Sequence, residues 1–156
     1  MCIRKWLVMF GIALLVIPVS IHAKEKKATP ESLPGVNVIE ADKVKEWLDA
    51  GEDIFILDAR KAPDYESGHI PGAERCTVPS DLNVEEESIK QSVAALQEYE
   101  VLKELHKNIR IITYCNGDTW WQSPKASLAL VKMGFKQVYW MREGINAWNK
   151  KGYPSE

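Results

Sequence analysis

The fold of this 156-residue chain is decided by residues 109–133, which begin Ile109-Arg110-Ile111-Ile112-Thr113-Tyr114-Cys115-Asn116-Gly117-Asp118-Thr119. The β-branched and apolar residues at the start of this stretch predict a buried strand. The turn-forming residues after Cys115 predict a loop. Ser123 and Pro124 are typical of a helix N-cap and a first helical position. We therefore predict a strand, a loop and a helix that ends near Gly134, with one cysteine at the junction.

Cys115 is the candidate catalytic residue because of this position. Open α/β sheets bind ligands outside the carboxyl ends of their strands, and the N-terminus of a helix favours an anion. The same field lowers the pKa of reactive cysteines from ~8.5 to between ~3.5 and ~7.5. We therefore expect a thiolate that is open to solvent. The alternative is a small buried apolar side chain, which is a common role of cysteine.

Composition and charge argue against several classes of function. With 46% hydrophobic and 27% charged residues, the chain predicts one globular domain with its own core. A formal charge of −2, without a stripe of lysine or arginine, gives no basis for nucleic-acid binding. The three histidines have no metal-ligand spacing. No glycine-rich nucleotide fingerprint occurs in the sequence, so we expect neither a metal nor a cofactor.

Residues 1–23 have the layout of a secretory signal peptide. Two basic residues precede an apolar run over residues 7–19, and Ala23 stands before a charged segment. We predict cleavage after Ala23 and a periplasmic or secreted protein without stable membrane insertion. The alternative is a membrane anchor formed by uncleaved residues 6–21, although this run is shorter than the ~20 residues of a typical span.

Cleavage would leave two thiols, because Cys2 lies in the removed segment. Cys76 and Cys115 would then share a compartment that oxidises thiols. They could form a disulfide, or serve as one buried cysteine and one nucleophile. The sequence leaves both arrangements open.

The remaining segments predict strands that alternate with helices. After a flexible lead-in over residues 24–35, we predict further strands at residues 36–39, 54–57, 73–78 and 136–140. We predict helices at residues 40–50, 88–106 and 144–150, and a helical turn at residues 63–67. This alternation is typical of an α/β domain with a central parallel sheet of about five strands and helices on both faces.

Asp58 and Arg60 follow the buried strand at residues 54–57. Charged groups at the end of a buried strand are costly unless they are paired. We expect them either to bond each other and nearby loops or to face a site.

Several segments resemble the signatures of the rhodanese domain. The first half of the chain carries Leu57-Asp58-Ala59-Arg60 and then Gly68-His69-Ile70-Pro71-Gly72-Ala73. The second half carries Tyr114-Cys115 and Gly134-Phe135. It ends with a pattern that runs from Val138 through Gly144-Ile145 and Ala147-Trp148 to Gly152-Tyr153-Pro154. The resemblance covers residues 36–154. It implies the rhodanese-like α/β fold and a sulfurtransferase activity. Cys115 would take a sulfane sulfur from thiosulfate or a related donor as a persulfide and pass it to a thiol or to cyanide.

The resemblance also implies roles for the neighbouring residues. Backbone N–H groups of the loop would hold the anionic persulfide, and Asp58 and Arg60 would brace the site rather than react. The implied partners are a small sulfur donor and a thiol acceptor, with a periplasmic protein as a further partner to consider. The loop residues concerned are Asn116, Gly117, Asp118, Thr119, Trp120, Trp121, Gln122 and Ser123.

The loop departs from the family pattern because no basic residue stands between Cys115 and Lys125. An anionic donor would lose a contact worth ~1.5–3 kcal/mol, so we expect thiosulfate to be a poor substrate. Residues 121–126 show a weaker similarity to rhodanese-like proteins of pyrroloquinoline-quinone-dependent catabolism, which carry a Cys-x-x-Cys-Trp motif; the second cysteine is absent here.

Two alternatives to a sulfurtransferase are consistent with the same residues. One is a binding module without chemistry, in which Trp120 and Trp121 present a surface to a partner. The other is a thiol redox protein with a Cys76–Cys115 disulfide.

Overall fold

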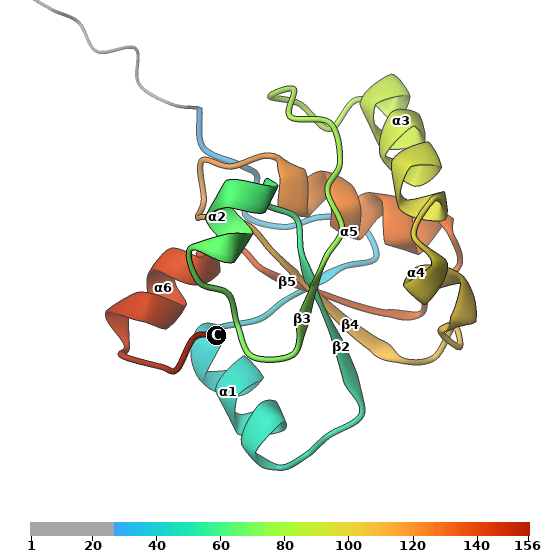
Figure 1. Ribbon diagram of the computed structural model, residues 1–156. Helices are drawn as coiled ribbons and strands as arrows, with labels where there is room; N and C mark the ends of the chain where they lie inside the picture. The colour runs from blue at the N-terminus through green and yellow to red at the C-terminus, as the bar shows by residue number, and fades with distance from the viewer. Residues whose placement is uncertain (1–26) are drawn as a thin grey trace, which may run out of the picture.

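Five parallel strands form the centre of the computed structural model, which describes residues 27–156 (Figure 1). They are β1 (Asn37–Val38), β2 (Ile54–Asp58), β3 (Ala73–Arg75), β4 (Arg110–Tyr114) and β5 (Gln137–Met141). Their order in the sheet is β1-β5-β4-β2-β3, and all neighbours pair in parallel. The predicted parallel α/β fold is therefore confirmed. The predicted signal peptide, residues 1–23, lies outside the described residues.

Helices cover both faces of the sheet, as the sequence predicts (Figure 1). On one face lie α3 (Glu86–Gln97), α4 (Glu100–Glu104) and α5 (Gln122–Lys132). On the other face lie α1 (Ala41–Asp49) and α6 (Gly144–Lys150). The short α2 (Ala62–Glu66) follows β2.

The two faces of the sheet bury separate apolar clusters. Side chains alternate along a strand, so β4 contributes Ile111 to the cluster under α3 and α5, and Ile112 to the cluster that contains Trp148 of α6. Ile111, Ile112 and Trp148 are fully buried. This two-sided burial explains why successive residues of β2 and β4, such as Ile56 and Leu57 or Ile111 and Ile112, are apolar rather than alternating with polar ones.

Three element boundaries differ from the prediction. The prediction of a single helix at residues 88–106 is wrong, because α3 and α4 are separated at Tyr99. The Tyr99 hydroxyl accepts the Thr77 backbone N–H at 3.0 Å. The strand expected to contain Cys76 ends at Arg75. Helix α5 begins at Gln122, so Ser123 is not its N-cap; the Ser123 hydroxyl instead accepts the indole N–H of Trp140 at 3.0 Å.

The sheet has a topological switch point between β2 and β4, which are neighbours in the sheet but not in the sequence. The chain leaves β2 through α2 toward β3, and it leaves β4 through α5 toward β5 on the opposite side. Parallel sheets bind ligands in the crevice at such a point. The loop that starts at Cys115 and the segment from Ala59 to Lys61 both leave the sheet at this crevice.

Candidate active site

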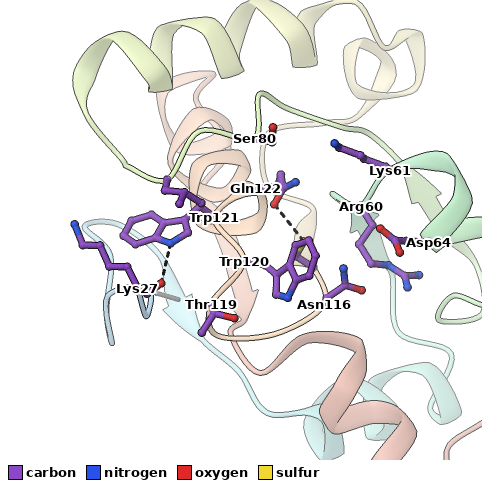
Figure 2. Close-up of a pocket in the computed structure, with 12 residues that line it drawn as sticks. Lys27, Arg60, Lys61, Asp64, Ser80, Asn116, Thr119, Trp120, Trp121 and Gln122 are labelled. Carbon is purple, nitrogen blue, oxygen red and sulfur yellow. Dashed lines mark hydrogen bonds between the residues drawn. The ribbon is translucent and has the colours of Figure 1, made fainter. Parts of the chain in front are cut away.

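A cavity of about 350 Å³ lies at the switch point, and Cys115 lines it (Figure 2). Its walls come from four separate segments: the lead-in, the residues after β2, the connection before α3 and the loop after β4. The lining residues are Lys27, Arg60, Lys61, Asp64, Ser80, Leu82, Cys115, Asn116, Thr119, Trp120, Trp121 and Gln122.

The structure divides the predicted loop residues into two groups. Asn116, Thr119, Trp120, Trp121 and Gln122 line the cavity together with Cys115. The other three do not line it. Gly117 and Asp118 face a separate surface hollow beside Glu143, and Ser123 is fully buried within the first turn of α5.

The Cys115 thiol lies at the bottom of the cavity, and only 1% of the residue is exposed. Its S–H donates to Oε1 of Gln122 at 3.6 Å. Burial raises the pKa of the thiol to about 12, and the backbone N–H of Asn116 opposes this only in part. The expectation of a thiolate open to solvent is therefore wrong for the free protein, because loss of hydration outweighs the loop dipoles.

The start of the loop is anchored to the first turn of α6. The Cys115 carbonyl accepts the N–H of Ile145 at 2.9 Å, and the Asn116 carbonyl accepts the N–H of Asn146 at 3.2 Å. Gly144 makes this approach possible. Its φ is +63°, and a Cβ at this position would lie 2.3 Å from the Cys115 carbonyl oxygen. The Gly-Ile pair in the closing pattern therefore has a physical role in placing the cysteine.

Three backbone amides of the loop remain unbonded. The N–H groups of Gly117, Asp118 and Thr119 donate to no other group within residues 27–156, whereas the N–H of Trp120 donates to the Gly117 carbonyl at 3.1 Å. Unbonded amides next to a cysteine are the groups that bind an anion.

Asp58 and Arg60 form a buried ion pair beside the cavity. Nη2 of Arg60 lies 2.6 Å from Oδ2 of Asp58, and the Arg60 backbone N–H also donates to the carboxylate, at 2.9 Å. The same Nη2 donates to the Gly68 carbonyl at 2.7 Å. The two side chains thus bond each other, and Arg60 also bonds a nearby loop. Arg60 lines the cavity as well.

Lysines from outside the loop bring positive charge to the cavity, and the loop sequence alone does not reveal them. Lys61 is exposed and lines the cavity directly after Arg60. Lys27 also lines it; its carbonyl accepts the indole N–H of Trp121 at 3.1 Å, and its ammonium lies 5.3 Å from the centre of that ring. In the sequence, only the position of Lys61 directly after the Asp58-Ala59-Arg60 signature indicated that it could lie at the site.

The segment predicted as a flexible lead-in makes specific contacts with the loop. Both the N–H and the hydroxyl of Thr29 donate to the Asp118 carbonyl at 2.7 Å. Arg142 donates to the carbonyls of Thr29 and Pro30 at 2.9 and 2.8 Å. The residues from Lys27 to Pro30 therefore hold the loop in addition to α6.

A buried lysine fixes the wall of the cavity before α3. Lys125 has no exposed side-chain surface, and its ammonium contacts the Asp81 carboxylate at 2.6 Å and the Asp81 carbonyl at 2.8 Å. Asp81 is thereby held against α5. Its neighbours Ser80 and Leu82 line the cavity, and Leu82 is 61% exposed.

The structure contradicts one of the two arrangements that the sequence leaves open, a Cys76–Cys115 disulfide. Both cysteines are free, and β2 lies between the strands that end at them. Two strand spacings amount to roughly 9.6 Å, which exceeds the Cα separation that a disulfide can bridge.

Residues 27–156 contain neither a cluster of metal ligands nor a helix suited to cross a membrane. No group of three histidine, cysteine, aspartate or glutamate side chains there could hold a metal ion. No helix in this part of the chain is long and apolar enough to cross a membrane.

Comparisons with known proteins agree with this geometry. Residues 40–151 match the rhodanese-like domain. A tRNA uridine(34) hydroxylase of Shouchella clausii is 31% identical over 134 residues, which are 85% of this chain and 36% of that protein. The chain thus spans about a third of the length of the curated relatives it matches. The match therefore concerns one region of each hydroxylase.

Solved structures show the same architecture. The rhodanese-like domain of an Anabaena protein has a TM-score of 0.57 and 28% identity, with 76% of each chain covered. A thiosulfate sulfurtransferase of Pseudomonas aeruginosa has a TM-score of 0.54 over 78% of this chain and 20% of that one. Its 22% identity supports the fold alone.

Proposed function

The chain belongs to the rhodanese-like domain family, and on this premise we propose that it is a sulfurtransferase that carries a sulfane sulfur on Cys115. The observation that carries the proposal is the position of this thiol. Cys115 lines a cavity at the switch point of a parallel sheet, next to loop amides that make no bond within residues 27–156.

The proposed reaction has two steps. The Cys115 thiol first loses its proton to solvent, and the thiolate attacks the outer sulfur of the donor. A sulfur–sulfur bond forms at Cys115, and the bond inside the donor breaks with its electron pair, so that thiosulfate releases sulfite. An acceptor thiolate or cyanide then attacks the outer sulfur of the persulfide, and the Cys115 thiolate leaves.

The surrounding residues have supporting roles in this proposal. The backbone N–H of Asn116, which already acts on the thiol, and the unbonded N–H of Thr119, which lines the cavity, would stabilise the persulfide anion. The Asp58–Arg60 pair would hold the neighbouring backbone, since both side chains are buried and bonded to each other. Because the thiol pKa is raised to about 12, we expect the loading rate to increase with pH and to reach no plateau below about pH 10.

We also propose that the protein is exported to the periplasm or secreted, with residues 1–23 as the cleaved signal peptide. The layout of these residues in the sequence supports this. An intact mass of the protein purified from its native compartment would test it. A mass that still includes residues 1–23 would contradict cleavage.

A binding module without chemistry is the second candidate. The 1% exposure of Cys115 favours it, because a thiol that stays protonated is a poor nucleophile. This candidate predicts that Cys115→Ser keeps the biological activity, whereas Trp120→Ala removes it.

Mass spectrometry separates the two candidates. The purified protein is incubated with thiosulfate at pH 7 and at pH 9.5, and the intact mass is measured without reductant. A sulfurtransferase gains about 32 Da, the mass of one added sulfur, as a persulfide, and Cys115→Ser abolishes the gain. Cys76→Ser is the matched control and should load like the unmodified protein. If neither thiosulfate nor any other sulfur donor changes the mass at either pH, the sulfurtransferase proposal is wrong.

A further inference from the structure

The cavity beside Cys115 is larger and more apolar than an inorganic sulfur anion requires. Its volume of about 350 Å³ falls in the range of roughly 300–1,000 Å³ that is typical of pockets for organic ligands. Trp120, Trp121 and Leu82 supply the apolar part of its wall. Leu82 is 61% exposed, although a leucine of this size normally gains from burial. An apolar group in the cavity would cover it.

Positive charge stands at one side of this apolar wall. Figure 2 shows the Lys61 side chain directed toward Ser80, on the side of the cavity away from Trp121 and Lys27. Within residues 27–156, the Lys61 ammonium makes no hydrogen bond or ion pair. Arg60 differs, because its guanidinium is bonded to Asp58 and to the Gly68 carbonyl. Lys61 is therefore a cation that a ligand in the cavity can bind, whereas the Lys27 ammonium lies 5.3 Å from the centre of the Trp121 ring.

We propose that the sulfur donor is an organic thiosulfonate-type anion rather than thiosulfate, an inference that rests on the proposed sulfur transfer at Cys115. The apolar group of the donor would pack against Trp120 and Leu82, its sulfonyl oxygens would bind Lys61, and its outer sulfur would meet Cys115. Apolar walls with a few convergent polar groups are typical of sites for such amphipathic ligands.

The corresponding step balances in atoms and charge. The Cys115 thiolate attacks the outer sulfur of the donor, and a sulfur–sulfur bond forms at Cys115. The bond between this sulfur and the sulfonyl sulfur breaks, and its electron pair leaves with the sulfinate. One thiolate and one thiosulfonate thus give one persulfide anion and one sulfinate anion.

Two donors that differ only in their organic group test the proposal. Benzenethiosulfonate and methanethiosulfonate carry the same reactive group, and the rate of Cys115 loading is followed by mass spectrometry for each. The ratio of their kcat/KM values is divided by the ratio of their rates with free cysteine, which removes the difference in intrinsic reactivity. We expect a corrected preference of at least about tenfold for the benzene compound, because its ring can bury apolar surface.

Four variants test the contributions of the apolar wall and of Lys61. Leu82→Ser should lower the corrected preference about fivefold, because the serine removes apolar wall area at an exposed position. Lys61→Gln should lower kcat/KM for both thiosulfonates about tenfold through KM, and Lys61→Arg should restore it. Lys136→Gln is the control, since this exposed lysine precedes the amino-terminal end of β5, whereas the cavity lies at the carboxyl ends of the strands. It should leave both rates unchanged.

The failures of the two proposals are distinguishable. If Cys115 is loaded by thiosulfate but the corrected preference for the benzene compound is absent, the inference about the substrate is wrong and sulfur transfer stands. A preference that Leu82→Ser leaves unchanged also overturns it. If neither thiosulfonate nor thiosulfate loads Cys115, sulfur transfer itself is wrong.

Discussion

Cys76 and Cys115 occupy equivalent places in the sheet, but the segments that continue from them differ. Each comes directly after a parallel strand, β3 or β4, and each is 1% exposed. Burial raises the pKa of both thiols to about 12. Cys76 packs in the apolar cluster under α3, however, whereas Cys115 lines a cavity of about 350 Å³.

The comparison shows that a strand end does not by itself make a reactive cysteine. The loop after Cys115 keeps three unbonded amides, and it is anchored by α6 on one side and by Thr29 on the other. The segment after Cys76 uses its Thr77 amide to bond Tyr99. Access and unbonded donors distinguish the two sites, whereas thiol ionisation in the free protein does not.

The largest expected effect concerns the close approach of Gly144 to the loop. Gly144→Ala should cost at least ~3 kcal/mol of unfolding free energy, because a positive φ is unfavourable for alanine and its Cβ would also overlap the Cys115 carbonyl. Gly72→Ala is the matched control, in the turn before β3. Gly72 has a φ of +75°, and nothing lies within 4 Å of its added Cβ.

The control should cost only the conformational part, about 1–2 kcal/mol. Urea unfolding of both variants measures the difference. Equal losses for the two glycines would mean that the contact at Cys115 is not a constraint on the loop.

Alkylation tests the difference in access. Iodoacetamide should modify Cys115 at least about tenfold faster than Cys76 at the same pH, because the cavity admits the reagent while Cys76 requires local unfolding. Both rates should increase with pH and show no plateau below about pH 10, since both thiols have raised pKa values. Peptide mapping after timed quenching measures both sites. Faster modification of Cys76 would contradict the assignment.

Removal of the Cys76 sulfur should destabilise the protein more than removal of the Cys115 sulfur, although Cys115 is the more accessible thiol. Cys76→Ala leaves a void in a packed cluster and should cost about 1 kcal/mol of unfolding free energy. Cys115→Ala should cost less than about half of that, because its sulfur already faces a cavity and loses only one weak hydrogen bond. Thermal or urea unfolding at pH 7 decides this. A larger loss at Cys115 would make it the structural cysteine.

Much of the fold can be predicted from short-range patterns. The apolar runs of β2 and β4 predict buried parallel strands because both faces of the sheet are covered, and the final helix has the predicted bounds. The break at Tyr99 could not be predicted, because its cause is a hydrogen bond to Thr77 from a distant segment.

In the candidate site, too, local features could be predicted from the sequence and features that depend on distant segments could not. The cysteine and the cavity-lining loop were predictable from a strand, turn residues and a helix start. The buried state of Cys115 and the contributions of Lys61 and Leu82 were not, because they depend on segments that only the tertiary fold brings together. The expectation of a low thiol pKa failed for this reason, since a dipole argument from sequence carries no information about burial.

The smallest expected effect is a difference in ionisation between the two thiols, which would come from the loop amides. Each thiol is neutral in the folded protein, and its pKa is raised from 9.0 to about 12. The stability from this neutral form is complete below pH 9 and decreases as the pH rises from 9 toward 12, because the unfolded chain ionises first. At pH 9.5 each thiol should therefore cost about 0.8 kcal/mol relative to pH 7.

Cys76→Ser and Cys115→Ser should each remove this cost, and the double variant should remove about 1.6 kcal/mol. Urea unfolding at pH 7 and pH 9.5 measures the four proteins, and ionisations that they share cancel in the differences. A smaller recovery for Cys115→Ser than for Cys76→Ser would show that the Asn116 amide and its neighbours offset a larger part of the burial effect on the folded pKa of Cys115. The two cysteines would then differ in ionisation as well as in access.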